Sequence, residues 1–121
     1  MNASYLKRTY GITVEEYVAI YNFQKGLCAI CRKMLRPPNS STKKGTKDGL
    51  RPEMDHNHKI RDKRKAVRGL LCGGKHFGCN RRLGRVDNRE WLMNASEYVQ
   101  NPPAQQALRE LAVKQGLKGE L

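Results

Sequence analysis

Apolar residues in the first quarter of the chain recur at intervals of three and four. Residues 3–10 could form two helical turns ended by Gly11, because glycine tolerates the positive φ of a helix stop. The segment Thr13-Val-Glu-Glu16 then has the form of a capping box, in which a hydroxyl and a carboxylate satisfy the first free amides of a helix. We therefore predict a helix over residues 14–24 that packs one apolar face on the core, formed by Val14, Tyr17, Val18, Ile20 and Tyr21.

The pattern changes in the middle of the chain. Residues 36–49 are rich in Pro, Ser, Thr, Lys and Gly, which predicts an exposed loop. Residues 50–55 alternate enough for a short strand, and Pro52 would confine that strand to a sheet edge. Residues 59–66 are rich in cations and residues 67–71 are mostly apolar. We therefore expect a hairpin with a basic tip and a returning strand.

Helical spacing returns in the last third of the chain. A helix should start at residues 79–80 and stop around residues 84–87. Either Asp87 or Asn88 can cap the next helix, which a proline pair ends, and residues 104–115 predict a last amphipathic helix. The apolar residues of the middle helix are spaced to pack on one face, and they are Trp91, Leu92, Ala95, Tyr98 and Val99.

The order of these elements predicts an α+β fold in a single domain over residues 1–121. The core would span about residues 26–86, between N-terminal helices over residues 3–25 and C-terminal helices over residues 88–115. So short a chain buries little of its surface, and only 38% of its residues are hydrophobic. A structural metal would supply the stability that a thin core lacks.

The charge balance is strongly basic, with 24 Lys and Arg against 11 Asp and Glu and a formal net charge of +13. Such an excess predicts a nucleic-acid partner. A merely basic surface, or a ribosome-associated protein, would show the same charge. No apolar run approaches 18 residues, and the first residues lack the features of a signal peptide, so we expect an intracellular protein without a membrane span.

Four cysteines form two pairs, Cys28-x2-Cys31 and Cys72-x6-Cys79. In a reducing compartment this spacing favours a zinc site over two disulfides, because four thiolates at tetrahedral geometry make a closed structural site. The first pair has the spacing of a zinc knuckle, whereas the second is wider. His76 lies inside the second pair and could replace Cys72 or Cys79. A redox pair at Cys28 and Cys31 is a weaker alternative, because the pair follows a helix and not a strand.

Asp55, His56 and Asn80 indicate chemistry of another kind. A carboxylate and an amide oxygen suit a hard cation such as Mg²⁺, and phosphodiester hydrolysis needs such a cation together with a base that deprotonates water. Histidine suits the base because its ordinary pKa of about 6.5 leaves it mostly neutral at cellular pH. Strand alternation would send Asp55 and His56 to opposite sides. We therefore expect the chain to turn at His56-Asn57.

These residues resemble a known family. The segment Met54-Asp55-His56-Asn57-His58, followed by Val67-Arg-Gly-Leu-Leu-Cys72 and Cys79-Asn80, is similar to the recombination endonuclease VII branch of the HNH, or ββα-metal, nucleases. Tyr10-Gly-Ile-Thr-x-Glu-Glu-Tyr17 and the Cys28-x2-Cys31 pair match the opening of that family. The resemblance covers roughly residues 9–100.

The resemblance implies a DNA endonuclease with an HNH (His-Me finger) core and two kinds of metal. Asp55 and Asn80 would hold a catalytic Mg²⁺ or Mn²⁺, His56 would be the general base, and His58 would support the metal site or the phosphate. Zinc on the four cysteines would brace the hairpin against the helix that carries Asn80. A phage origin is typical of the family.

Three segments depart from the family pattern. The loops between Cys31 and Asp55 and between His58 and Val67, and the second cysteine spacing, are longer than in compact relatives. The tail after Gln100 is shorter than in the junction-resolving member, so neither a homodimer nor a preference for four-way junctions follows from the resemblance.

The alternative to catalysis is a zinc-stabilised module that binds DNA or RNA without cutting it, and a structural protein of the ribosomal type is a third possibility. An enzyme would lose cleavage but keep binding when the histidine is changed. No base-reading motif is evident, so strong sequence specificity is not expected. The candidate phosphate contacts are basic residues of the hairpin and of the helix after it, namely Arg61, Lys63, Arg64, Lys65, Arg68, Arg81, Arg82 and Arg85.

Overall fold

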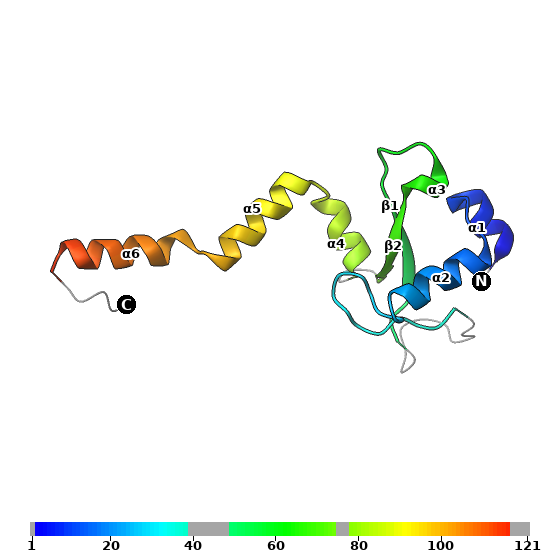
Figure 1. Cartoon of the computed structure of the whole chain (residues 1–121), viewed down its shortest axis with the longest axis horizontal. Coiled ribbons are helices and arrows are strands. Elements are labelled where there is room, and N and C mark those ends of the chain that lie inside the picture. The colour runs from blue at the N-terminus through cyan, green and yellow to red at the C-terminus, as the bar shows by residue number, and fades with distance from the viewer. Residues whose placement is uncertain (1, 39–48, 75–77, 117–121) are drawn as a thin grey trace. The chain divides into compact units, whose positions relative to one another are not determined.

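The computed structural model describes residues 2–38, 49–74 and 78–116, and Figure 1 shows the chain. The chain forms two compact units, Met1–Arg85 and Val86–Leu121. Within the described residues, the first unit contains four helices and a two-stranded antiparallel sheet, and the second contains two helices. The expected α+β fold is confirmed.

Two short helices open the chain, and local hydrogen bonds fix where each begins. Helix α1 (Ala3–Tyr10) starts where Asn2 Oδ1 accepts the amide of Tyr5 at 3.0 Å, and it ends at Gly11, which has a φ of 68°. Helix α2 (Val14–Phe23) starts with the predicted capping box. In that box Thr13 Oγ1 accepts the amide of Glu16, and the Glu16 carboxylate accepts the amide of Thr13. Both helix predictions are confirmed.

The predicted hairpin is also present. Strand β1 (Pro52–His56) pairs antiparallel with β2 (Val67–Cys72), and each strand extends one residue beyond the predicted end. The basic tip contains a helical turn that the sequence pattern did not predict, α3 (Lys63–Ala66). This turn forms because the side chain of Asp62 accepts the amide of Lys65 at 3.1 Å and so caps it.

A β-bulge interrupts the hairpin beside the predicted catalytic residues. Asp55 pairs with Gly69 while the next residue, His56, pairs with Val67, so Arg68 is the extra residue on β2. A bulge of this kind bends the strand and re-aims a side chain. Its result here is that the guanidinium of Arg68 meets the carboxylate of Asp55 directly across the hairpin.

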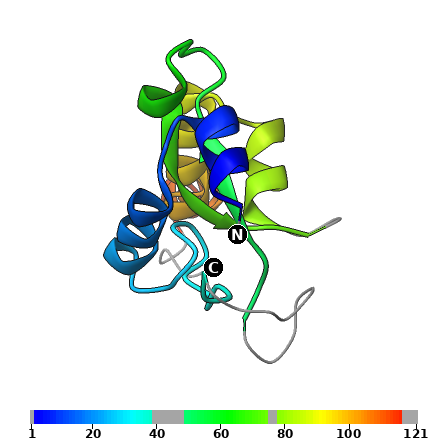
Figure 2. The same ribbon diagram turned by 90° about the vertical axis from the view of Figure 1, so that its right-hand side faces the viewer.

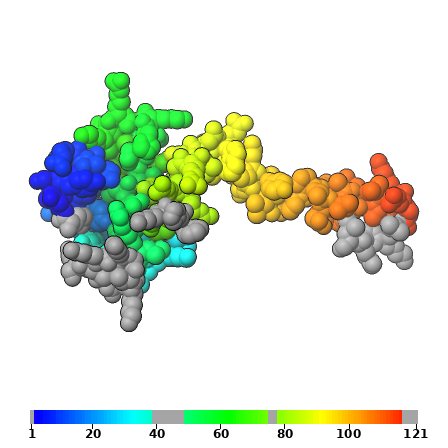
Figure 3. All heavy atoms as spheres, turned by 180° about the vertical axis from the view of Figure 1, so that it is seen from behind, coloured from blue at the N-terminus to red at the C-terminus, as the bar shows by residue number. Residues whose placement is uncertain are grey.

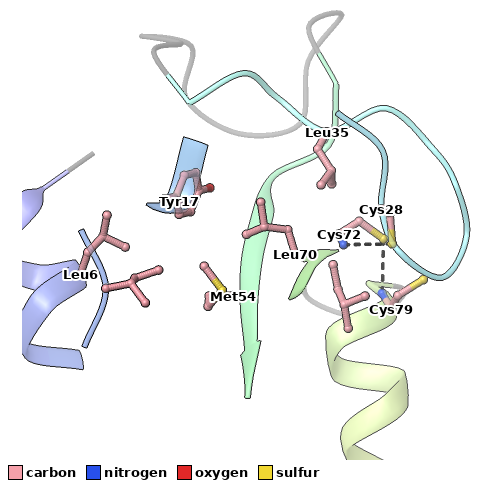
Figure 4. Packing of buried hydrophobic residues seen from close by; sticks show 10 residues of the cluster. Leu6, Tyr17, Cys28, Leu35, Met54, Leu70, Cys72 and Cys79 are labelled. Atoms are coloured by element: carbon pink, nitrogen blue, oxygen red, sulfur yellow. Dashed lines mark hydrogen bonds between the residues drawn. The ribbon is translucent and has the colours of Figure 1, made fainter. Parts of the chain in front are cut away.

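The core of the first unit lies between the helices and the hairpin. Figures 1 and 2 show α2 on one side of the hairpin and helix α4 (Cys79–Arg85) on the other, as predicted for a helix that follows β2. In Figure 3 the atoms of α1 (blue) lie next to those of the hairpin (green). Figure 4 shows the buried side chains, which are Leu6, Ile12, Tyr17, Leu35, Met54, Leu70 and Leu71 together with Cys28, Cys72 and Cys79.

The second unit contains the two predicted C-terminal helices. Helix α5 (Arg89–Gln100) begins where Asn88 caps the amide of Trp91, and α6 (Pro103–Lys114) begins at a proline. Within the described residues of the second unit, the apolar face expected on α5 is not covered, since no residue of α5 is buried and Trp91 is 55% exposed. Helical spacing specifies such a face but not the surface that covers it. In the described part of the chain, no helix is long and apolar enough to cross a membrane.

Candidate functional site

The four cysteines converge from three separate parts of the first unit. Cys28 and Cys31 lie in the loop after α2, Cys72 ends β2, and Cys79 begins α4. The four sulfur atoms lie within 4.8 Å of one another, and the Sγ atoms of Cys31 and Cys72 are 3.8 Å apart. A tetrahedron with Zn–S distances of about 2.3 Å has S···S edges of about 3.8 Å. The cluster could therefore hold a metal such as zinc.

The surroundings of the thiols also suit a metal. Burial raises the pKa of the Cys28 thiol, but amides of Cys31, Ile30 and Cys72 donate to its sulfur and bring the pKa down to about 7. Burial and then the neighbouring sulfurs raise the pKa of Cys79 to about 12. Figure 4 shows the amide of Cys72 on Cys28 Sγ at 3.4 Å and that of Cys79 on Cys72 Sγ at 3.3 Å. A metal that takes all four sulfurs would displace their protons.

The structure bears on the alternatives to a zinc site at these cysteines. All four are free, so the structure contains no disulfide among them. His76, which could replace one cysteine, lies outside the described residues. Cys72 and Cys79 tie the end of the hairpin to the start of α4, which is the place where the resemblance put a structural zinc.

The two histidines lie together at the end of β1. The ring centroids of His56 and His58 are 4.3 Å apart, and the Tyr10 ring of α1 meets the His56 ring at 5.9 Å in an edge-on arrangement. The expected turn starts at Asn57, whose side chain accepts the amide of Lys59 and whose amide donates to Ala66. Burial, followed by a hydrogen bond with a second tyrosine, raises the pKa of Tyr10 to about 12, so its hydroxyl stays protonated beside His56.

Asp55 is buried and is held by a bidentate ion pair. Its side chain is 12% exposed, and Arg68 donates to it through Nε at 2.7 Å from Oδ2 and through Nη2 at 3.2 Å from Oδ1. Paired contacts of this kind between guanidinium and carboxylate are strong and fix the carboxylate plane. The sequence predicted that Arg68 contacts phosphate. In this structure it contacts Asp55, which was predicted to bind the catalytic metal.

Asn80 lies in the first turn of α4 and reaches β1. Its Nδ2 donates to Glu53 Oε1 at 3.1 Å, and Glu53 stands two residues before Asp55 on the strand. Glu53 and Asn80 both line a cleft of about 520 Å³, together with Tyr10, Tyr17 and Arg51. Asp55 and His56 are not among the residues that line this cleft.

Glu53 is absent from the residues predicted from the sequence, although a usable signal was present. Side chains on a strand alternate between faces, so an acidic residue two positions before Asp55 shares its face. The structure connects Asn80 to β1 through this residue. Among the described residues, the side-chain hydrogen bonds of Asp55 go to Arg68 and that of Asn80 goes to Glu53, so no hydrogen bond joins Asp55 to Asn80.

The predicted phosphate contacts other than Arg68 divide into two groups. Arg61, Lys63, Arg64 and Lys65 are exposed in the hairpin tip, but two of them hold neighbouring helices. Lys63 Nζ donates to the carbonyl of Arg8 at 2.6 Å, and Arg64 pairs with Glu16. The other group is exposed on α4 beside Asn80 and comprises Arg81, Arg82 and Arg85.

Comparison with known proteins decides the family. The model of the family described as recombination endonuclease VII matches residues 3–101, which is most of the chain. The chain belongs to the recombination endonuclease VII family. Family membership confirms the resemblance seen in the sequence.

Two phage relatives carry the name "Gene 59 protein". That of Mycobacterium phage D29 is 42% identical to this endonuclease VII family chain over 104 residues, and that of Mycobacterium phage L5 is 41% identical over 104 residues. Each match covers 84% of this chain and 52% of the relative. The chain therefore spans about half the length of these relatives. No solved structure matches the chain significantly.

Proposed function

We propose that this chain is a metal-dependent DNA endonuclease that hydrolyses phosphodiester bonds. His56 is the general base, Asp55 and Asn80 hold a divalent Mg²⁺ or Mn²⁺, and His58 supports the site. The observation that carries the proposal is the contact of Asn80 with β1, the strand that bears Asp55 and His56. This contact joins α4, which carries Asn80, to the strand that carries Asp55 and His56, in a chain of the endonuclease VII family.

The donor set fits a hard cation. Asp55 offers a carboxylate and Asn80 an amide oxygen, which are ligands that Mg²⁺ and Mn²⁺ accept. Each carboxylate oxygen has more than one lone pair, so Asp55 can keep its contact with Arg68 and still offer an oxygen. When bound, the cation would neutralise the charge that develops on the phosphate and on the leaving oxygen.

The chain's own residues perform the proton transfer. His56 takes a proton from a water molecule, the water oxygen bonds to phosphorus, and the bond between phosphorus and the leaving oxygen breaks. The leaving oxygen keeps the electron pair of that bond and takes a proton from solvent. The Tyr10 and His58 rings both contact the His56 ring and limit the positions that it can adopt. The basic residues of α4 beside Asn80 hold the phosphate backbone.

Single-turnover cleavage tests the proposal. Matched linear, nicked, flapped and four-way DNA substrates are incubated with the full chain in Mg²⁺ or Mn²⁺, and the best substrate is then used for the variants. We expect His56→Ala to lower the rate by on the order of 10²-fold or more while DNA binding stays near wild type. His58→Ala is the matched control, because it removes the adjacent imidazole, and its defect should be milder.

The metal ligands should behave differently from the base. Asp55→Ala and Asn80→Ala should raise the Mg²⁺ or Mn²⁺ concentration needed for half-maximal cleavage, so that added metal restores part of the rate. Zinc content should be unchanged in all four variants, because none of these residues belongs to the cysteine cluster. A folded, zinc-loaded His56→Ala protein that cuts DNA at the wild-type rate would exclude His56 as the base.

The second candidate is a zinc-stabilised nucleic-acid-binding module without catalysis. The cysteine cluster and the net charge of +13 suffice for such a module. It is distinguished by a wild-type chain that binds DNA tightly and leaves every substrate intact in either metal.

We also propose that two copies of the chain pair through the second unit. The support is the exposed apolar side chains of α5 and α6, which include Trp91, Tyr98 and Leu108, all at least 45% exposed. A two-helix unit with so little buried surface gains stability when such residues are covered. Sedimentation velocity of the full chain tests this pairing, and Trp91→Ser with Tyr98→Ser should shift the protein to monomer.

A further inference from the structure

We propose that Glu53 is a positioning residue that fixes the amide of Asn80, so that Asn80 turns its Oδ1 oxygen to the divalent cation. The inference rests on the proposed function, because it concerns the same metal site. Three observations carry it: the Asn80–Glu53 hydrogen bond, the close packing of Glu53 on Gly73, and the ion pair of Glu53 with Arg51.

The hydrogen bond determines which end of the amide is available. A side-chain amide has an NH₂ end that donates and an oxygen that accepts, and the two ends have almost the same shape. A carboxylate accepts hydrogen bonds and cannot donate them. Because Asn80 Nδ2 faces Glu53 Oε1 at 3.1 Å, the amide oxygen must point away from Glu53. A metal ligand needs that oxygen, and the NH₂ end cannot replace it.

Glu53 is itself held in place by its neighbours. A Cβ atom added to Gly73 would lie 2.3 Å from Glu53 Cδ, so only a glycine leaves room for the carboxylate there. Arg51 Nη2 lies 3.6 Å from Glu53 Oε2. The Glu53 side chain is 28% exposed, and Asn80 and Tyr10 line the same cleft. These contacts limit the positions that the Glu53 carboxylate can adopt.

Direct metal binding tests the role without relying on catalysis. The full zinc-loaded chain is titrated with Mn²⁺ by calorimetry, and the dissociation constant is compared for wild type, Glu53→Ala, Asn80→Ala and the double variant. Loss of a residue that orients a metal ligand typically weakens metal binding 10–100-fold, so we expect about a tenfold weaker Mn²⁺ site in Glu53→Ala. Glu53→Gln should stay near wild type, since its amide oxygen can still accept from Asn80.

The double variant separates a positioning residue from an independent ligand. If Glu53 acts through Asn80, the double variant should bind Mn²⁺ no more weakly than Asn80→Ala alone. Additive losses, or a Glu53→Gln variant as weak as Glu53→Ala, would mean that Glu53 binds the metal itself and would overturn the positioning role. Wild-type affinity in Glu53→Ala would overturn it as well.

Gly73→Ala provides a second perturbation that leaves both polar side chains in the sequence. The added methyl group displaces the Glu53 carboxylate, so Mn²⁺ affinity should fall as in Glu53→Ala. Zinc content is measured in parallel, because Gly73 follows the zinc-site residue Cys72. Wild-type Mn²⁺ affinity in this variant would contradict the inference. If the wild-type chain binds no Mn²⁺, or if its Mn²⁺ affinity is unchanged in Asn80→Ala, the proposed function is refuted instead.

Discussion

The side chain of Gln24 should contribute more to stability than that of any other polar residue of α2. It is the C-cap residue of α2, and its side chain forms three hydrogen bonds with the backbone, two of them with Leu70, which lies 46 positions away. Its Nε2 donates to the carbonyls of Leu27 at 2.8 Å and Leu70 at 2.9 Å, and its Oε1 accepts the amide of Leu70 at 2.8 Å. The amide thus pairs with β2 as a neighbouring strand would, and it closes one edge of the hairpin that carries the site.

The expected loss of stability in Gln24→Ala follows from the backbone groups that lose their hydrogen-bond partner. Leu70 is fully buried, so water cannot replace the lost partner of its amide, and an unsatisfied buried group costs about 1–3 kcal/mol. The Leu70 carbonyl keeps the amide of Ala29 at 3.2 Å, and the Leu27 carbonyl loses an ordinary bond of roughly 0.5–1.5 kcal/mol. We therefore expect the free energy of unfolding to fall by about 2–4 kcal/mol in total, within the usual range for a buried hydrogen-bond network.

Urea unfolding at saturating zinc measures this change, and amide hydrogen exchange at Leu70 locates it. The Leu70 amide should exchange faster in Gln24→Ala than in wild type, beyond the change that global stability explains. Gln24→Glu keeps the shape of the side chain, but a carboxylate oxygen takes the place of the Nε2 that donates to the carbonyls of Leu27 and Leu70. This variant should therefore be at least as unstable as Gln24→Ala. Asn22→Ala, at an exposed position of the same helix, is the control and should change stability by no more than about 0.5 kcal/mol. A loss below about 0.5 kcal/mol in Gln24→Ala would refute the reasoning.

Two further predictions concern zinc and DNA. Metal analysis should find about one Zn per chain, and a chelator should unfold the first unit, because the cysteines join the loop after α2, β2 and α4; a zinc-free chain that stays folded would contradict this. DNA affinity should fall steeply with salt. Arg81→Ala and Arg82→Ala should each reduce the slope of log affinity against log salt by about the contribution of one phosphate contact. Arg64→Ala is the control and should reduce this slope less, because Arg64 forms an ion pair with Glu16. Equal slopes in all these variants would show that α4 is ordinary solvated surface.

Several elements could be predicted because short-range chemistry decides them. The capping box of Thr13 and Glu16 joins residues three apart, as does the cap of Asn88 on Trp91. Such bonds form from local sequence whatever the rest of the fold does. The cysteine pairs were recognisable for a related reason, since soft thiolate ligands and the spacing of a knuckle indicate zinc without any knowledge of the fold. The short helix α3 was not predicted because its capping residue, Asp62, lies among the basic residues 59–66, and their charge was the feature from which a hairpin tip was predicted.

Other contacts depend on which residues meet across the fold. Gln24 meets Leu70, 46 positions away, and Asn80 meets Glu53, 27 positions away. Nothing in the spacing of either pair distinguishes it from many others of the same chemistry. The roles of Asp55, His56, His58 and Asn80 stay predictions that these contacts support.

The sequence by itself therefore determined the helices other than α3, the hairpin, the cysteine pairs as candidate metal ligands and the family, because each depends on local bonds or on residue type. Only the tertiary structure decided how the site is held. The bulge adds Arg68 to one strand and brings it to Asp55, and a shift of one residue in this register would have sent the side chains to the opposite face. Register is set by the packing of the whole hairpin against its helices, so it cannot be obtained from any one segment.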